Sequence, residues 1–414
     1  MEEEACRMGR DVARAKLHTS LLIWVRSIDW ASAVPDSEGG EPFRLVRWPR
    51  LQVMTAVGAI EITVPSYEKV GKPSMRPVEA MLGIRSSVSP LLQKMCGSIG
   101  AELPFLAAER ELAELAGIRV SRSTINRVCI ELGDAAEEDQ KEMRLPGGFG
   151  EATRVTVQID GGRVNTDEGW KEPRLARIEA VNARGMKAVL MLTAIVSAEA
   201  FWTRISGTLD RLGLATCARL AFLSDGAKWI LQEAAKRYPK ALCILDFYHA
   251  AEHIHDAAEA IFGEGTFVAK AWARRFVKLL RRGSIDRVLV AWRHAAGPLG
   301  RRSASARKAM AGLIAYFEER VDQVRYPRYR RRGFPIGSGQ IEAAVKQVLN
   351  LRLKRNGAWW TTRNAERMLA LRAAKILGRL DEVWRRRITR LCRDIPTPLA
   401  AVTASAPSPK LLVA

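Results

Sequence analysis

The stretch Val155-Thr-Val-Gln-Ile-Asp160-Gly-Gly162 is a short apolar run that stops at a carboxylate and two glycines. Such a run predicts a buried β-strand that carries an acid to the edge of a sheet. A second run of this kind is Leu220-Ala-Phe-Leu-Ser-Asp225-Gly226, and Gly337-Ser-Gly-Gln-Ile-Glu342 opens a helix much later. Together these stretches predict that three carboxylates, those of Asp160, Asp225 and Glu342, meet at one place.

Strand and helix patterns alternate after the first run. We predict strands over 155–160, 174–183, 187–196, 219–224 and 241–245, and helices over 199–213 and 227–238. Three strands with a hairpin turn, followed by two βα units, is the order of a ribonuclease-H-like α/β fold, although other mixed α/β domains share it. Residues 151–246 and 334–378 would form this domain, and the helical residues 247–333 would be an insertion into it.

The N-terminal part of the chain changes character near residue 75. Residues 1–74 predict a β-hairpin, and residues 75–150 predict helices, with a helix-turn-helix over about 105–133. Ser121 is the expected N-cap of its second helix. The residues of that helix expected to reach a DNA groove are Arg122, Ser123, Asn126 and Arg127, with plain helix packing as the alternative. Residues 394–414 are rich in Pro, Ser, Thr and Ala and predict a disordered tail.

Positive charge is concentrated in one part of the chain. The formal net charge is +21, and residues 263–393 hold 32 of the 66 Lys and Arg residues but 9 of the 45 Asp and Glu residues. That segment therefore carries +23 and the rest carries −2. Such a field favours a polyanion, which we interpret as DNA, over a merely solubilising face. A membrane surface is the weaker alternative, because no lipid-binding motif accompanies the charge.

Composition also bears on the compartment. The sequence contains no apolar run of about 18 residues, so no transmembrane helix is predicted. The acidic start Met1-Glu-Glu-Glu lacks an apolar signal segment, and the six cysteines show no C-x-x-C spacing. These features are typical of a protein of a reducing cytoplasm and argue against a disulfide framework or a structural zinc site.

Three gathered carboxylates repel one another unless a cation lies between them. Hard oxygen ligands select Mg²⁺ or Mn²⁺, and two such ions can activate an attacking oxygen and stabilise a leaving one in phosphodiester cleavage. Each Asp-Gly is more often an ordinary turn when taken alone, and Asp246 also ends a strand and competes with Asp225 for the second position. We prefer Asp225, because it follows the fourth strand. Ser338 is expected to cap the helix of Glu342.

Other residues are candidates for supporting roles. His249 and His253 share a helix face, but the Glu of a zinc-protease helix is missing. A structural histidine at a strand–helix junction is the alternative. Trp359 follows a basic run and would stack on bases if exposed, whereas paired tryptophans are commonly buried. We expect Asp246, His249, Ser338 and Lys346 to support the acids or to position DNA, and Arg352, Lys354, Arg355 and Trp359 to contact DNA.

Several of these motifs, taken together, resemble the DDE transposases of bacterial insertion sequences. They are Val157-Gln-Ile-Asp160-Gly-Gly, Leu223-Ser-Asp225-Gly-Ala-Lys-Trp-Ile, Leu245-Asp-Phe-Tyr-His249, Gly337-Ser-Gly-Gln-Ile-Glu342-Ala and Arg352-Leu-Lys-Arg-Asn-Gly-Ala-Trp359. The likeness covers about residues 75–375 and is greatest to the Kra type, which is related to Mutator-like transposases. It implies a ribonuclease-H-like core with an all-helical insertion, and it assigns the three acids to Asp160, Asp225 and Glu342.

The resemblance also implies an activity and partners. The expected activity is Mg²⁺-dependent cleavage at the ends of a mobile element and strand transfer into target DNA, by a homo-oligomer in the active complex. Asp246-Phe-Tyr-His249 matches the short C/D-x-x-H motif of these proteins. Relatives often carry N-terminal cysteine pairs, which this chain lacks. The alternatives are a catalytically inactive DNA-binding protein derived from a transposase and a ribonuclease-H-like nuclease that does not join strands.

Overall fold

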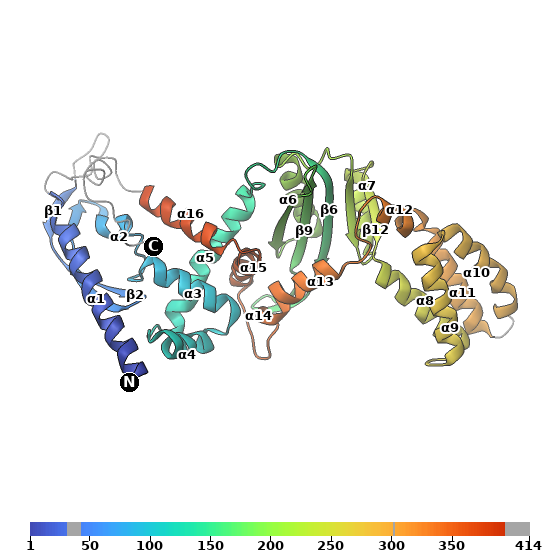
Figure 1. Cartoon of the computed structure of the whole chain (residues 1–414), viewed down its shortest axis with the longest axis horizontal. Coiled ribbons are helices and arrows are strands. Elements are labelled where there is room, and N and C mark those ends of the chain that lie inside the picture. The colour runs from blue at the N-terminus through green and yellow to red at the C-terminus, as the bar shows by residue number, and fades with distance from the viewer. Residues whose placement is uncertain (31–42, 301–302, 394–414) are drawn as a thin grey trace. The chain divides into compact units, whose positions relative to one another are not determined.

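The computed structural model describes residues 1–30, 43–300 and 303–393 (Figure 1). The chain forms two compact units, one made of Met1–Asp139 with the chain from Arg367 onward, and one made of Gln140–Glu366. The linker predicted over 36–42 and the tail predicted over 394–414 lie outside the described residues. No helix among the described residues is long and apolar enough to cross a membrane.

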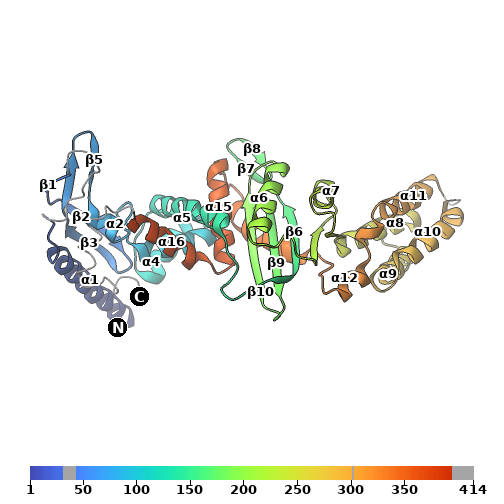
Figure 2. The same cartoon turned by 90° about the horizontal axis from the view of Figure 1, so that it is seen from above.

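A mixed five-stranded sheet organises the second unit, which makes the protein an α/β protein. Its strands are β6 (Ala152–Gly161), β9 (Arg174–Asn182), β10 (Lys187–Ala194), β11 (Leu220–Ser224) and β12 (Leu242–Leu245), in the order β10-β9-β6-β11-β12. Figure 2 shows β10, β9 and β6 of this sheet side by side. The central strand β6 pairs antiparallel with β9 and parallel with β11. The predicted hairpin is the antiparallel pair of β9 and β10, and the two predicted βα units supply the parallel strands β11 and β12.

The sheet is buried because its strands are apolar on both faces. One face packs on α6 (Ala198–Arg211) and α7 (Lys228–Arg237), where Phe222 stacks against Tyr238 and Trp202 is fully buried. Parallel strands covered on both faces give near-continuous apolar runs, which is the pattern of β11. A small hairpin, β7 (Val164–Thr166) with β8 (Gly169–Lys171), follows β6 and was not predicted.

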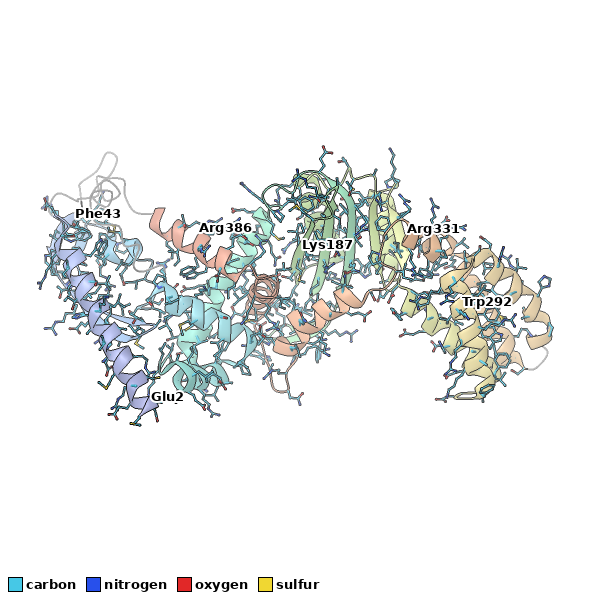
Figure 3. The ribbon with its side chains drawn as sticks, in the orientation of Figure 1. Glu2, Phe43, Lys187, Trp292, Arg331 and Arg386 are labelled. Carbon is cyan, nitrogen blue, oxygen red and sulfur yellow. The ribbon has the colours of Figure 1, made fainter. Side chains whose placement is uncertain are left out.

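Helices fill the chain between β12 and the helix of Glu342, as predicted. They are α8 (Phe247–Phe262), α9 (Phe267–Arg282), α10 (Ile285–Gly300), α11 (Ala304–Glu318), the 3₁₀ turn η1 (Val321–Gln323) and α12 (Tyr326–Arg331). Trp292 lies at the centre of their core and is fully buried (Figure 3). That core continues into Leu223 and Ile244 of the sheet, so the insertion and the strands share one apolar cluster.

The chain returns to the sheet through α13 (Gly339–Val345), which lies against β6 and β9. A π-helical turn, η2 (Lys346–Asn350), and α14 (Leu351–Leu353) follow, and α15 (Thr362–Ile376) comes after the loop with the paired tryptophans. The Asp167 N–H donates a 2.8 Å hydrogen bond to the carbonyl of Trp360, which ties that loop to the β7–β8 hairpin.

The first unit begins with α1 (Glu2–Arg26), which packs on the hairpin of β2 (Arg50–Thr55) and β3 (Gly58–Thr63). This is the predicted hairpin, with its turn at Gly58. Three further strands, β1 (Arg44–Arg47), β4 (Ser66–Lys69) and β5 (Lys72–Met75), form a second sheet.

The helices of the first unit are α2 (Pro77–Met81), α3 (Pro90–Glu102), α4 (Phe105–Ala116), α5 (Arg122–Glu142) and α16 (Leu380–Arg393). The bounds predicted for α4 are those observed. The second helix of the predicted helix-turn-helix runs beyond Gly133 to Glu142. Gly133 is tolerated inside α5 because a Cβ there would meet the backbone of Arg367, so only glycine allows this approach. The sequence reading missed α16 entirely.

Candidate functional site

Asp160 lies at the C-terminal end of β6 and is half-buried. Its Oδ1 accepts a 2.6 Å hydrogen bond from the backbone N–H of Gly161. Burial raises the pKa of the Asp160 carboxyl to about 6; the Gly161 hydrogen bond opposes this rise, and the charges of Asp225 and Glu342 add to it. The other two predicted acids are thus within electrostatic reach of Asp160.

Asp225 follows the last residue of β11, the parallel neighbour of β6. Its side chain is exposed, and its Oδ1 accepts a 3.1 Å hydrogen bond from the Ala227 N–H, as in an Asx turn. Parallel neighbours end at the same edge of a sheet, which is why these two acids share that edge.

Asp246, the rival for the second position, has a different environment. It follows β12, but its side chain is only 3 % exposed and both of its oxygens are engaged. Oδ1 accepts a 3.0 Å hydrogen bond from the Tyr248 N–H, which caps α8, and Oδ2 accepts a 2.6 Å hydrogen bond from the Ser338 hydroxyl. The structure therefore places Asp225, and not Asp246, in the open position beside Asp160.

Ser338 links Asp246 to the third acid. It lies at the N-cap position of α13, as predicted, but its hydroxyl makes no capping bond to the helix backbone. The hydroxyl is hydrogen-bonded to Asp246 and also to Oε1 of Glu342. The expected capping role was wrong, because no backbone N–H of α13 donates to the Ser338 Oγ, and its hydroxyl is directed to the two carboxylates instead.

The motif around Asp246 and the motif around Ser338 dock directly on one another. The Phe247 N–H donates a 2.8 Å hydrogen bond to the carbonyl of Ile336. A Cβ on Gly337 would lie 3.0 Å from the Tyr248 ring and 3.7 Å from the Asp246 carboxylate. The glycine before Ser338 is needed for this close approach, which fixes the start of α13 against the end of the sheet.

Tyr316, on α11, was not singled out from the sequence. Its hydroxyl lies 3.5 Å from the place that a Cβ on Gly226 would take, next to Asp225. The ring is held between that of His253, at 4.0 Å between centroids, and the guanidinium of Arg320, at 4.1 Å. Burial raises the pKa of Tyr316, Arg320 lowers it and Asp225 raises it. No spacing signal announces this contact, because Tyr316 belongs to the insertion and reaches Asp225 only through the tertiary fold.

The two histidines after Asp246 do not form a metal site. The rings of His249 and His253 pack edge to face at 5.1 Å between centroids, and Nδ1 of His249 lies 3.2 Å from Oε2 of Glu252. Burial lowers the pKa of His253, and the charge of His249 lowers it further. His253 thus supports Tyr316 by ring packing, while His249 is partly exposed near the acids.

The basic run after α13 divides between surface and interior. Arg352 is 4 % exposed, and its guanidinium lies 5.0 Å from the centre of the Trp360 ring. The predicted DNA contact by Arg352 is therefore not supported, because α14 turns this side chain inward. Trp360 is buried and Trp359 is 65 % exposed, so the paired tryptophans have different roles. The side chains of Lys346, Lys354 and Arg355 are exposed.

The predicted helix-turn-helix lies in the first unit. Gly117 ends α4 in the left-handed conformation, and the Ser121 hydroxyl accepts a 3.3 Å hydrogen bond from the Thr124 N–H, which confirms the predicted N-cap. Of the four predicted DNA contacts on α5, Arg122, Ser123 and Arg127 are exposed and Asn126 is half-buried. Arg127 donates to the carbonyl of Ser86 at 3.4 Å.

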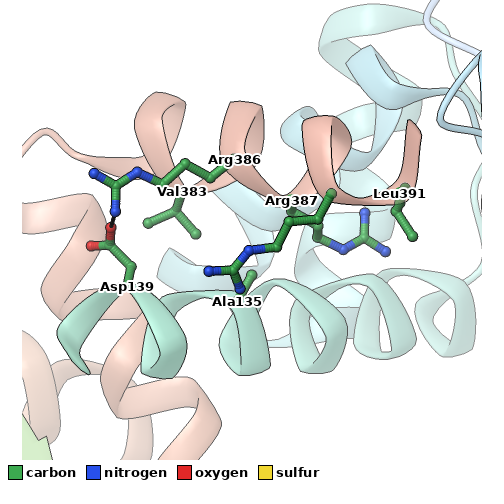
Figure 4. Close-up of a pocket in the computed structure, with 7 residues that line it drawn as sticks. Ala135, Asp139, Val383, Arg386, Arg387 and Leu391 are labelled. Carbon is green, nitrogen blue, oxygen red and sulfur yellow. Dashed lines mark hydrogen bonds and ion pairs between the residues drawn. The ribbon is translucent and has the colours of Figure 1, made fainter. Parts of the chain in front are cut away.

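A cavity of about 120 Å³ opens between α5 and α16 in the first unit, and none of the predicted residues lines it (Figure 4). Its guanidinium groups are engaged by acids. Arg386 pairs with Asp139 at 2.8 Å, and Arg387 pairs with Glu131. These ion pairs join two helices, so the cavity is a structural joint and not a binding site.

The candidate site has the donor chemistry of a hard divalent cation. Carboxylate oxygens, as in Asp160, Asp225 and Glu342, are what Mg²⁺ or Mn²⁺ prefers. Burial is the main cause of the raised pKa of Asp160, and a cation would relieve the smaller contribution from the charges of Asp225 and Glu342. The described residues contain no ready-made cluster of three His, Cys, Asp or Glu side chains placed to hold a metal. Glu342 is instead hydrogen-bonded to Ser338, so the three acids supply the ligand type for such a cation without forming an assembled site in this structure.

Comparison with known proteins gives one match. The model of a family described as "Uncharacterised protein family (UPF0236)" matches residues 80–387, about three quarters of the chain. The matched stretch contains the helix-turn-helix, all three acids and the insertion. No curated protein matches the chain.

Proposed function

The chain belongs to the uncharacterised protein family UPF0236, and we propose that it is a metal-dependent DNA transposase of the DDE type. The observation that carries the proposal is the electrostatic coupling of Asp160 to Asp225 and Glu342. These residues come from two neighbouring strands and from a helix more than a hundred positions further along the chain. A structural role gives no reason to gather three like charges at one edge of a sheet.

We further propose that the catalytic unit is ribonuclease-H-like. The strand order β10-β9-β6-β11-β12, with β6 antiparallel to β9 and parallel to β11 and β12 beyond, supports this proposal. So does the helical insertion between the second and third acids, from α8 to α12.

The residues divide the chemistry among them. Asp160, Asp225 and Glu342 would hold Mg²⁺ or Mn²⁺, two ions in the full site, and bound divalent cations supply the charge that activates an attacking oxygen and stabilises a leaving one. Asp160 and Asp225 approach from fixed strand ends, whereas Glu342 approaches from α13. Asp246 and Ser338 set the position of Glu342 through their hydrogen bonds.

Substrate binding falls to the surrounding charge. The exposed side chains of Lys346, Lys354, Arg355 and Trp359 follow Glu342 along the chain and are the proposed DNA contacts of the catalytic unit. Arg122, Ser123, Asn126 and Arg127 are the proposed contacts of the helix-turn-helix unit. Phosphate contacts by lysine and arginine position the duplex, and base contacts supply sequence preference.

The test is cleavage and joining of duplex DNA from both flanks of the gene, with Mg²⁺. We expect Asp160→Asn, Asp225→Asn and Glu342→Gln each to abolish cleavage and to leave DNA binding intact. Glu199→Gln, at an exposed acid on α6 of the same unit, is the matched control and should retain activity. Cleavage that survives in all three variants would refute the site, and cleavage without joining would indicate a nuclease instead.

A further inference from the structure

The edge of the five-stranded sheet opposite the candidate site is basic. Arg154 lies near the start of β6, and Arg219 immediately precedes β11, whereas Asp160 and Asp225 lie at the other ends of these same strands. A strand rises about 3.3 Å per residue, so the run from Arg154 to Asp160 separates the two edges by roughly 20 Å. A phosphate bound at the basic edge is therefore out of reach of the acids.

The same edge continues to the far side of the sheet. Asn182 pairs with Ala152 because β9 runs antiparallel to β6, so the turn from β9 to β10 comes to this edge. Arg184, in that turn, and Lys187, at the start of β10, are exposed. Five strands spaced about 4.8 Å apart make the edge roughly 20 Å long.

The short helix α12 lies at the other end of this edge, where buried side chains and a hydrogen bond hold it. Tyr326 and Tyr329 are fully buried. Arg219 donates a hydrogen bond to the carbonyl of Arg332, and the guanidinium of Arg154 lies 2.5 Å from where a Cβ on Gly333 would stand. Figure 1 shows α12 and α13 at different ends of the sheet.

Three arginines project from α12 into solvent. Arg328, Arg330 and Arg331 are exposed, and within the described ranges none of them has an acidic partner. Arg331 is labelled in Figure 3. Arg325, just before the same helix, does have one, because it pairs with Asp322 at 3.0 Å. The unpaired charges are thus a property of the outward face of α12.

Like charges fixed this close together repel one another and oppose folding, unless an anion neutralises them. Two acids lie at this edge, Glu151 just before β6 and Asp210 near the end of α6, and they are too few to neutralise the basic side chains. A duplex carries one negative charge per about 1.7 Å of its axis, so a basic strip of roughly 20 Å matches a run of phosphates.

We propose that this basic edge, Arg154, Arg184, Lys187 and Arg219 with the arginines of α12, binds the backbone of a DNA segment other than the one held at the carboxylates. The inference rests on the proposed function, because it takes DNA as the partner. It adds a second, non-catalytic duplex contact on the opposite side of the catalytic sheet. Sequence is not read there, since arginine and lysine on phosphates carry no base information.

Salt dependence of binding tests the proposal. The affinity of the full chain for a random-sequence DNA duplex is measured by fluorescence anisotropy over a range of NaCl concentrations. Replacing Arg328, Arg330 and Arg331 by Gln together should reduce the magnitude of the negative slope of log affinity against log salt by about 2–3, at about 0.9 per lost phosphate contact. The double variant Arg184→Gln with Lys187→Gln, at the other end of the edge, should reduce that magnitude by about 1–2.

A matched control removes the same charge elsewhere. Arg7, Lys16 and Arg26, all exposed on α1, are changed to Gln together, and the slope should stay near that of the unmodified chain. An unchanged slope in both edge variants would overturn the proposal, as would an equal loss in the control or an effect confined to duplex RNA. Failure of the unmodified chain to bind DNA at all would instead count against the proposed function.

Discussion

The hydroxyl of Ser338 lies 2.6 Å from the buried carboxylate of Asp246, although 92 residues and a whole helical insertion separate the two in sequence. The same hydroxyl is hydrogen-bonded to Glu342. A hydroxyl has a single proton to donate, so the two carboxylates compete for it. Asp246 also caps α8 through the Tyr248 N–H, so the Ser338 hydroxyl connects the end of the sheet to Glu342.

Removing the Ser338 hydroxyl should therefore impair cleavage without removing a proposed metal ligand. We expect Ser338→Ala to lower the cleavage rate about tenfold, equivalent to about 1.4 kcal/mol, and to raise the Mg²⁺ concentration needed for half-maximal cleavage. Ser338→Thr keeps the hydroxyl and should restore most of the rate. A uniform loss in both variants, with unchanged Mg²⁺ dependence, would indicate a packing role only.

The raised pKa of Asp160 predicts a pH dependence of stability. The folded protein holds this pKa at about 6, above the ordinary value of 3.8, so the ionised form is disfavoured by folding. The contribution of Asp160 to stability is complete below about pH 4 and is lost as the pH rises through about 6. Without divalent metal, Asp160→Asn should stabilise the protein by about 1–2 kcal/mol at pH 8 and by nothing at pH 4, after allowance for partial exposure.

Thermal unfolding of both proteins in EDTA across this pH range measures the effect. Mg²⁺ should then raise the melting temperature of the unmodified chain at pH 8 more than that of Asp160→Asn, because the cation relieves a charge that the variant lacks. Parallel stability curves for the two proteins from pH 4 to pH 8 would show that folding does not raise the pKa of the Asp160 carboxyl.

Part of the candidate site could be predicted from the sequence, and part of it could not. The positions of Asp160 and Asp225 at strand ends follow from local apolar runs, since β-strand signals are local, although β6 begins at Ala152, three residues before its predicted start. The contact of Tyr316 with the backbone beside Asp225 could not be predicted, because it arises where α11 packs on the end of β11. The inward turn of Arg352 likewise depends on Trp360, whose burial the sequence left open.

The elements that the sequence reading missed share a cause. The helix α16 is strongly basic and lies just before the polar tail, and its ion pairs with α5, such as that of Arg386 with Asp139, are formed only after folding. The β7–β8 hairpin has strands of three residues, too short for a periodic signal. Tertiary partners, and not local propensity, decide both.

The close approach of β6 to the turn after α13 predicts a steric effect at Gly162. A Cβ there would lie 2.4 Å from Cδ2 of the fully buried Leu349. We expect Gly162→Ala to destabilise the protein by about 1–3 kcal/mol, as overpacking does, and to lower cleavage because Asp160 is two residues away. In a chemical denaturation cycle, the double variant with Leu349→Ala should be less destabilised than the sum of the two single variants. Additive effects would exclude this contact.

Because the insertion and the sheet share one apolar core, we expect a substitution in the insertion to lower the stability of both. Trp292 is fully buried, its indole N–H has no hydrogen-bond partner among the described residues, and its ring lies 5.1 Å from that of Phe317. Trp292→Ala should cost about 3–5 kcal/mol of unfolding free energy. Trp292→Phe keeps most of the apolar volume and should cost much less. Urea denaturation measures both losses of unfolding free energy. A small loss for Trp292→Ala would show that α10 is loosely packed.

The first turn of α5 predicts where sequence preference in DNA binding comes from. The backbone N–H of Arg122 donates to Glu109 at 3.0 Å, whereas its exposed guanidinium makes no ion pair within the described ranges. Arg122→Ala should weaken binding to the element ends by about 1–3 kcal/mol if the side chain reads a base edge, and should change binding to random DNA much less. Competition binding with end-derived and scrambled duplexes separates the two, with Arg110→Ala, exposed on the neighbouring helix α4, as the control. Equal losses on both duplexes would assign Arg122 to phosphate contact and leave sequence reading to other residues.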